Sequence, residues 1–215
     1  MTAPRSPIGN TLYPASRAGD TEAMTASELP PPTVLADAAA WRAWLDEHED
    51  TSDGLWLLLA KKGKNPPTTL TYQEALEEAL CSGWIDGQRR TVDAHGFRQR
   101  FTPRRPRSIW SRRNVEIIAR LESEGRMRER GWAEVELAQA DGRWENAYAG
   151  PATAEVPAEL TAALGTSPAA KAAFEQLTGS ARYAALHPLL VARNAQIRER
   201  RIAALLKELE RPAGE

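Results

Sequence analysis

Residues 81–114, CSGWIDGQRRTVDAHGFRQRFTPRRPRSIWSRRN, combine Trp, Arg and turn residues more densely than any other part of this 215-residue chain. The side chains alternate in character over residues 84–92 and again over residues 97–102, as they do in half-buried β-strands. Between these segments, DAHG at 93–96 has the residue types of a turn. The stretch therefore predicts a β-hairpin, and the flanking segments are interpreted as its support.

Alternation along a strand also predicts which side chains share a face of the hairpin, because successive side chains point to opposite sides. The predicted groups are Phe97, Gln99 and Phe101 on one face of the second strand, Arg98, Arg100 and Thr102 on its other face, and Trp84, Asp86, Gln88 and Arg90 together on the first strand. One face of the hairpin is therefore expected to be strongly polar.

Positive charge is concentrated in the same stretch. Residues 89–113 contain nine arginines and one acid, whereas the whole chain has a formal net charge of -1. Pro103 is expected to end the strand, so that Arg104 and Arg105 lie in a loop, and Ser111 is a typical N-cap for the next helix. The free amide groups of a helix start favour an anion, so the loop predicts an anion-binding site.

Local signals predict further elements on both sides of the hairpin. Asp37 is a typical N-cap for a helix that runs to about His48, and the apolar run LWLLLA at 55–60 is typical of a central strand covered on both faces. Thr71 and Glu74 form a capping box at the start of another helix. Two more helices are expected between the hairpin and residue 142, and Gly83, Gly125 and Gly142 are predicted to end the helices that precede them.

Composition divides the chain into three predicted parts. Residues 1–32 lack periodic apolar residues and predict a disordered tail, in which Met24 is an alternative to Met1 as the true start. Residues 33–150 predict an α+β core, and residues 151–215, which are richer in Ala and Pro, predict three helical segments. The expected fold class is thus α+β, a small sheet with a β-hairpin packed by helices and followed by a C-terminal helical subdomain.

Composition also excludes several classes of protein. With 42% hydrophobic residues the chain can bury a core, but no apolar run approaches the roughly 18–20 residues of a membrane span. The start lacks a secretory signal, so we expect a cytoplasmic protein without a membrane span. One Cys and three scattered His give no zinc-ligand spacing, and residues 61–65 lack the spacing of a phosphate loop. No metal or cofactor is therefore expected.

Three motifs resemble a known family. SGWIDG at 82–87, RFTPRRPRSIWSRRN at 100–114 and DGRW with the following AY at 141–148 are similar to the bacterial YdeI/OmpD-associated family. The resemblance covers roughly residues 35–209. Members are described as bacteriocin-protection or stress-resistance proteins without an agreed reaction. The resemblance therefore implies a cytoplasmic ligand-binding or stress-resistance protein that protects against antimicrobial compounds or peptides.

The residue types of these motifs suit a pocket for a small molecule or peptide with an anionic group. Aromatic faces supply stacking and cation–π contacts, arginine forks bind carboxylate or phosphate, and an acid can bind a cationic group. The predicted ligand-binding residues are Trp84, Asp86, Arg100, Arg104, Arg105, Trp110, Ser111, Asn114, Asp141 and Trp144.

Three other interpretations remain open. The arginines of residues 89–113, interleaved with Phe101 and Trp110, could bind nucleic acid by neutralising phosphates and stacking on bases. Alternatively, Asp86 or Asp141 could serve an enzyme as general acid or base, although no catalytic signature is present and no catalytic residue is assigned. In the last interpretation, Trp and Arg only lock the hairpin to the helices.

Overall fold

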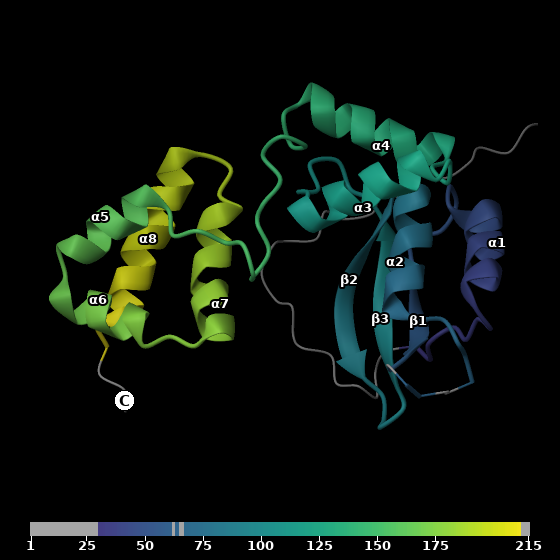
Figure 1. Cartoon of the computed structure of the whole chain (residues 1–215), viewed down its shortest axis with the longest axis horizontal. Helices are drawn as coiled ribbons and strands as arrows, with labels where there is room; N and C mark the ends of the chain where they lie inside the picture. The colour runs from purple at the N-terminus through teal and green to yellow at the C-terminus, as the bar shows by residue number, and fades with distance from the viewer. Residues whose placement is uncertain (1–29, 62, 65–66, 212–215) are drawn as a thin grey trace, which may run out of the picture. The chain divides into compact units, whose positions relative to one another are not determined.

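A computed structural model describes residues 30–61, 63–64 and 67–211 of the chain. Its sheet is antiparallel and three-stranded, in the order β1-β3-β2, with β1 at Leu55–Ala60, β2 at Trp84–Thr91 and β3 at Gly96–Pro103. Helices pack around this sheet and follow it (Figure 1), so the predicted α+β class is confirmed. The β2–β3 hairpin is the predicted one, with Asp93 accepting hydrogen bonds from the turn amides of His95 and Gly96.

The prediction that residues 55–60 form the central strand is wrong, because the hairpin strand β3 lies between β1 and β2. The apolar run reflects burial rather than a central position, since five of its six residues are buried. On its outer side β1 forms two isolated bridges. Thr33 donates to Trp56 O and accepts from Leu58 N, and the Ala60 amide donates to Leu70 O. These bridges satisfy part of the backbone hydrogen-bonding groups on the free edge of β1.

The faces predicted for the first hairpin strand are wrong after Asp86. Asp86 lies opposite Phe101 and Arg89 lies opposite Gln99, so three steps along β2 match two along β3. The extra residue makes a β-bulge, which reverses the alternation beyond it. Gln88 therefore lies in the bulge, and Arg90 lies on the face opposite to Asp86.

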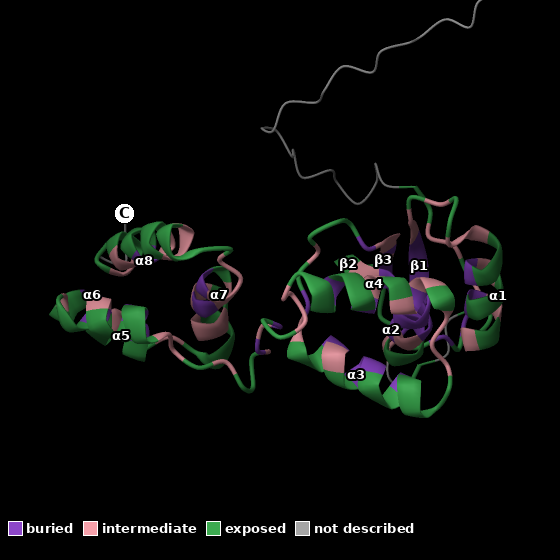
Figure 2. Cartoon of the chain, turned by 90° about the horizontal axis from the view of Figure 1, so that it is seen from above, coloured by how far each residue is buried: buried purple, intermediate pink, exposed green. Residues whose placement is uncertain are grey.

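Two helices cover the sheet face that carries Leu57, Leu59 and Phe101. They are α1 (Ala38–His48), capped by Asp37 as predicted, and α2 (Tyr72–Cys81), which has the predicted capping box. Figure 2 colours the chain by burial; β1, β3 and α2 are largely buried, whereas most of β2 is exposed. The hydrophobic core that these elements share consists of Trp41, Leu45, Leu57, Leu59, Leu70, Ala75, Ala79, Trp84, Phe97 and Phe101.

A second core lies between α2 and the next two helices, α3 (Arg112–Ser123) and α4 (Glu129–Ala140). Ser111 caps α3 by accepting from the Asn114 amide, as predicted. Gly83, Gly125 and Gly142 all have positive φ, as expected of residues that end helices. The members of this core are Leu76, Leu80, Cys81, Trp110, Ile117, Ile118, Leu121, Val135, Ala138 and Ala147.

Four helices follow within residues 153–211, one more than predicted. They are α5 (Ala158–Gly165), α6 (Pro168–Glu175), α7 (Gly179–Leu190) and α8 (Ala195–Leu209). Ser167 caps α6 by accepting from the Ala170 amide, and Gly179 begins α7. A core of their own, within residues 160–205, holds these helices together.

Other sequence predictions fall at the limits of the described residues. The predicted tail lies outside them except for its last three residues, and so does Met24. Of residues 61–65, which lack the spacing of a phosphate loop, Lys61, Gly63 and Lys64 are described, and Gly63 and Lys64 are exposed. None of the described helices combines the length and the apolar character needed to cross a membrane. The division of the chain at residue 150 stays a prediction.

Candidate functional site

Arg104 lies at the centre of the residues that the hairpin and its following loop bring together. Its backbone amide donates to Gly83 O, which holds the start of the loop against the end of α2. Although Arg104 lies in a loop, the residue is only 5% exposed. The guanidinium carbon lies 3.4 Å from the centre of the Trp110 ring, and Nη1 donates to Ile109 O. Among the described residues, Nε and Nη2 have no hydrogen-bond partner.

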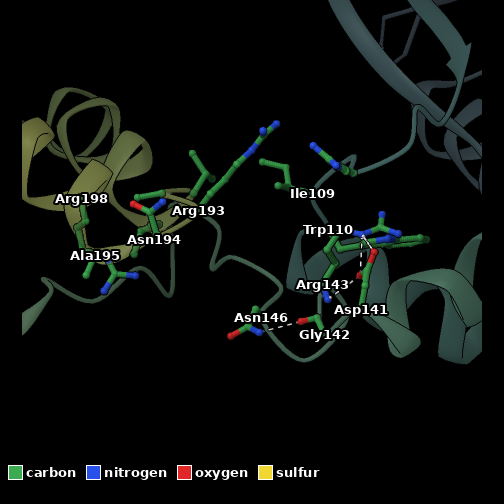
Figure 3. A pocket seen from close by; sticks show the side chains of 14 residues that line it. Ile109, Trp110, Asp141, Gly142, Arg143, Asn146, Arg193, Asn194, Ala195 and Arg198 are labelled. Carbon is green, nitrogen blue, oxygen red and sulfur yellow. Dashed lines mark hydrogen bonds and ion pairs between the residues drawn. The ribbon is translucent and has the colours of Figure 1, made fainter.

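The ring of Trp110 lies against the guanidinium of this arginine. Its ring is buried, and the ring of Trp144 meets it edge to face at 4.9 Å between centroids. Nearby, the Arg143 guanidinium donates from Nε to both carboxylate oxygens of Asp141 and from Nη1 to Ser108 O. Figure 3 shows this Arg143–Asp141 pair beside Trp110. Arg143 is therefore already paired, whereas Arg104 is not.

A second set of polar side chains adjoins Arg104. Tyr72, at the start of α2, donates from its hydroxyl to Asp86 Oδ2 on β2, at 2.8 Å. Tyr148 lies alongside Trp110, because its amide donates to Trp110 O and its carbonyl accepts from the Arg112 amide. These backbone bonds place the Tyr148 side chain next to Ser111, the N-cap of α3.

The electrostatics confirm that these groups share one environment. Burial lowers the pKa of Arg104 to about 10, so the guanidinium stays charged at neutral pH. Burial and the Asp86 carboxylate raise the pKa of Tyr148, and the same two causes raise that of Tyr72. Burial raises the pKa of Glu134 on α4, even though Arg104 lies close enough to oppose the shift. Asp86, Tyr148 and Glu134 are thus all in electrostatic range of Arg104.

The structure brings together most of the predicted site residues. Arg104 stacks on Trp110, the Trp144 ring meets Trp110 edge to face, and Ser111 adjoins Tyr148. Asp86 accepts a hydrogen bond from Tyr72. Asn114 is buried in the first turn of α3, where its backbone amide donates to the Ser111 hydroxyl.

Three predicted residues lie apart from this group. Trp84 is fully buried in the core under the sheet, where it packs against Trp41 and Trp44, so it cannot form a wall of the same pocket as Trp110. The other two are Arg100, which points to the opposite sheet face and donates to Asp53 O, and Arg105, which is exposed. Asp141 lies beside Trp110 but is exposed and paired with Arg143.

The sequence did not single out Tyr72, Tyr148 or Glu134. Tyr72 lies between Thr71 and Glu74, the residues of the α2 capping box, so its position in the sequence indicates only the start of a helix. Tyr148 closes the motif at 141–148, so its position in that motif was the available signal. Glu134 has no local signal, because only the docking of α4 carries it toward Arg104. Among the described residues, no three His, Cys, Asp or Glu side chains converge on a metal site.

Two family models match different parts of the chain. Residues 33–134, which contain the hairpin and the Arg104 loop, match a domain of unknown function (DUF8412). Residues 153–211 match the model described as bacteriocin-protection, YdeI or OmpD-associated. No curated protein and no solved structure matches the chain. The motifs at 82–114 thus lie outside the second match, although they resembled that family. The chain carries, at residues 153–211, a domain of the bacteriocin-protection, YdeI- or OmpD-associated family.

Proposed function

We propose that residues 33–150 bind a small molecule or peptide through an anionic group at Arg104, and that the protein protects its cell in this way against antimicrobial compounds. The observation that carries the proposal is the state of Arg104. It is charged, 5% exposed and stacked on Trp110, and it has no acidic partner among the described residues. Buried charges are usually paired, so a ligand that supplies the missing acceptor fits this position.

The chemistry of the guanidinium indicates which acceptor would fit. Its free Nε and Nη2 atoms lie on one edge of the planar group, and this edge binds a carboxylate or phosphate through two parallel hydrogen bonds. A buried donor without a partner costs about 1–3 kcal/mol, which a bound anion would recover. The half-buried Trp144 ring, which meets Trp110 edge to face, provides apolar area for the rest of such a ligand.

Burial argues against the nucleic-acid interpretation of the same stretch. Phe101 is fully buried and Trp110 is 2% exposed, so neither ring is available to stack on bases. Arg98 and Arg104 are buried as well, which removes them from a surface that could neutralise phosphates along a strand. A compact anionic ligand therefore suits the site better than a polynucleotide.

Calorimetry with small carboxylates and phosphate monoesters tests the proposed binding. Arg104→Lys keeps the charge but loses the planar fork, so we expect its Kd to rise at least tenfold, about 1.4 kcal/mol. Arg105→Lys, at an exposed position in the same loop, is the matched control and should leave Kd unchanged. Equal Kd values for wild type and Arg104→Lys, or no binding by any probe, would refute the proposal.

The protective role calls for a separate experiment in cells. A cytoplasmic action is expected, and the description of the family at 153–211 names bacteriocin protection. Cells that express the wild type should survive a bacteriocin panel better than cells that express Arg104→Lys at equal protein level. Equal survival of cells with wild type and with Arg104→Lys would show that protection does not depend on binding at Arg104.

A further inference from the structure

We infer that a cavity lined by Arg107, Arg143 and Arg193 binds a small organic dianion with an apolar body, such as a phosphate monoester or a dicarboxylate. The cavity has a volume of about 520 Å³, within the roughly 300–1,000 Å³ that is usual for ligand pockets. Arg104 does not line this cavity. The inference therefore concerns a second site and does not depend on the proposed function.

Three segments of the chain line the cavity, and all of them belong to the compact unit formed by residues 32–215. The segments are residues 107–110, 141–146 and 190–198. Contacts beside the cavity connect the second segment to the helix that precedes the third. The Tyr183 hydroxyl donates to Ala149 O, and the Tyr148 ring meets the His187 ring edge to face at 5.1 Å between centroids.

The first observation is the excess of positive charge in this cavity, which four arginines and one acid line. The acid, Asp141, is fully engaged, because both of its carboxylate oxygens accept from Arg143 Nε. Arg107 and Arg193 form no hydrogen bond or ion pair with the part of the chain that the structure describes. Two arginines without a counter-charge on one concave surface attract a ligand that carries two negative charges.

The second observation is the start of α8 at the same cavity. Asn194 caps this helix by accepting from the Ile197 amide, and Ala195, the first residue of the helix, lines the cavity. The free amides of a helix start favour an anion, so the helix dipole adds to the field of the arginines. Arg198 also lines the cavity but donates to Glu159, so it contributes no excess charge.

The third observation is the backbone of Arg107. Among the described residues, it is the only one other than glycine with a positive φ, at 70°. Side chains other than that of glycine make this conformation unfavourable, and such strain is typical of ligand-binding sites. Glycine would adopt the same turn without strain. The arginine at this position is therefore retained for its side chain and not for the turn.

The fourth observation is the apolar surface beside these charges. Ile109 is 44% exposed, which is unusual for so large an apolar side chain. Trp110, Leu190 and Val191 contribute further apolar surface to the lining. In Figure 3 the Arg193 side chain extends toward Ile109. A ligand that combines anionic groups with an apolar body uses both features, whereas inorganic phosphate uses only the arginines.

Calorimetry on the full chain with four probes tests the ligand class. Phenyl phosphate and isophthalate combine a ring with two charges, whereas benzoate has one charge and inorganic phosphate has no ring. The titrations are made at about pH 8, where a phosphate monoester with a second pKa of about 6 is dianionic. At least one of the first two probes should bind at least tenfold more tightly than benzoate and inorganic phosphate. If neither does so, the inference is overturned, and this comparison requires no variant.

Variants from two segments then locate the site. Arg107→Gln and Arg193→Gln should each raise the Kd of the preferred dianion at least tenfold. Arg105→Gln and Arg200→Gln, at exposed positions that do not line the cavity, are the matched controls and should leave Kd unchanged. If only one of the two lining variants weakens binding, the two arginines do not share a ligand and the assignment of the cavity is wrong.

Two further measurements separate this site from a structural role and from the proposed anion site. Arg107→Gly should weaken dianion binding as Arg107→Gln does, with a melting temperature equal to or above that of wild type. A lower melting temperature would show that the Arg107 side chain stabilises the loop, which contradicts its assignment to the ligand. If Arg104→Lys weakens dianion binding while Arg107→Gln and Arg193→Gln do not, the proposed anion site stands and the cavity fails.

Discussion

At the scale of single residues, Arg104 combines two opposing contributions to stability. Its stacking on Trp110 is favourable, by about 2 kcal/mol for a desolvated cation–π contact. Its two buried N–H groups without a partner are unfavourable, each by about 1–3 kcal/mol. In the ligand-free protein these contributions offset one another, which is typical of residues retained for binding rather than for stability.

A substitution at Arg104 should therefore separate binding from folding. Arg104→Met keeps an unbranched apolar side chain on the Trp110 ring and removes the unpaired donors. We expect the melting temperature of the ligand-free protein to stay unchanged or to rise, whereas anion binding is lost. Differential scanning fluorimetry of the variant measures the first effect, with Arg105→Met as the exposed control. A melting temperature lower than that of wild type by more than about 4 °C, equivalent to more than about 1 kcal/mol, would show that Arg104 stabilises the fold.

The site could be predicted from the sequence only where its residues are local. Arg104, Trp110 and Ser111 stand within eight residues of one another, so their proximity was visible in the sequence. The approach of Tyr72 to Asp86 depends on how α2 packs on β2, and no local pattern encodes that distance. The burial of Arg104 likewise depends on Trp110 turning its ring toward the loop.

At the scale of elements, the sequence predicted the ends of helices. It predicted the pairing of β2 with β3 but neither their register nor the position of β1 in the sheet. The capping box of Thr71 and the N-cap at Ser111 are complete within four residues, which is why the sequence predicts them. The bulge between Asp86 and Arg89 depends on the register with β3. For the same reason, the edge position of β1 could not be derived from its apolar run.

The docking of α4 on α2 depends on Gly131. A Cβ built at this position would overlap the Cys81 carbonyl oxygen, so the two helices approach too closely for any side chain. Gly131→Ala should lower the free energy of unfolding by about 1–3 kcal/mol, as measured by urea denaturation. Gly165→Ala, where no neighbouring atom lies within 4 Å, is the control and should cost nothing. An unchanged midpoint for Gly131→Ala would contradict this packing.

The ion-pair network between α2 and the α3–α4 connection predicts a specific pH dependence. Burial acts to raise the pKa of Glu77, but hydrogen bonds from Gln73, Arg126 and Arg120 outweigh it and hold that pKa below its usual value. A carboxyl whose folded pKa is depressed contributes stability above its unfolded pKa, near 4.5, and this contribution disappears as the pH falls further.

Thermal melts between pH 7 and pH 3 can isolate this contribution. Glu77→Gln should be less stable than wild type at pH 7, and the difference should shrink as the pH falls below about 4.5. Glu122→Gln, at an exposed acid on α3, should parallel wild type throughout. A Glu77→Gln difference that does not vary with pH would mean that Glu77 contributes through packing and not through its charge.

At the scale of the whole molecule, the buried residues fall into groups that follow the chain order. The cores formed by α1–α4 and the sheet use residues 41–147, whereas the core of α5–α8 uses residues 160–205. The two family matches, at 33–134 and 153–211, leave residues 135–152 between them, and these residues overlap the interval 148–159 between the cores. The boundary at residue 150, which the change in composition predicts, falls in that overlap.

This separation predicts that each part folds without the other. A fragment of residues 151–215 should show helical circular dichroism and melt cooperatively, although with small stability, because a chain of about 60 residues buries limited surface. Within it, Phe174→Ala should unfold the fragment, since loss of a buried Phe costs about 3–5 kcal/mol.

A fragment of residues 33–150 should bind the same carboxylate probe as the full chain within threefold in Kd, because Arg104, Trp110 and Trp144 all lie inside it. If this fragment folds but binds more than tenfold more weakly, the ligand also requires side chains from residues 151–215, and the site as assigned is incomplete.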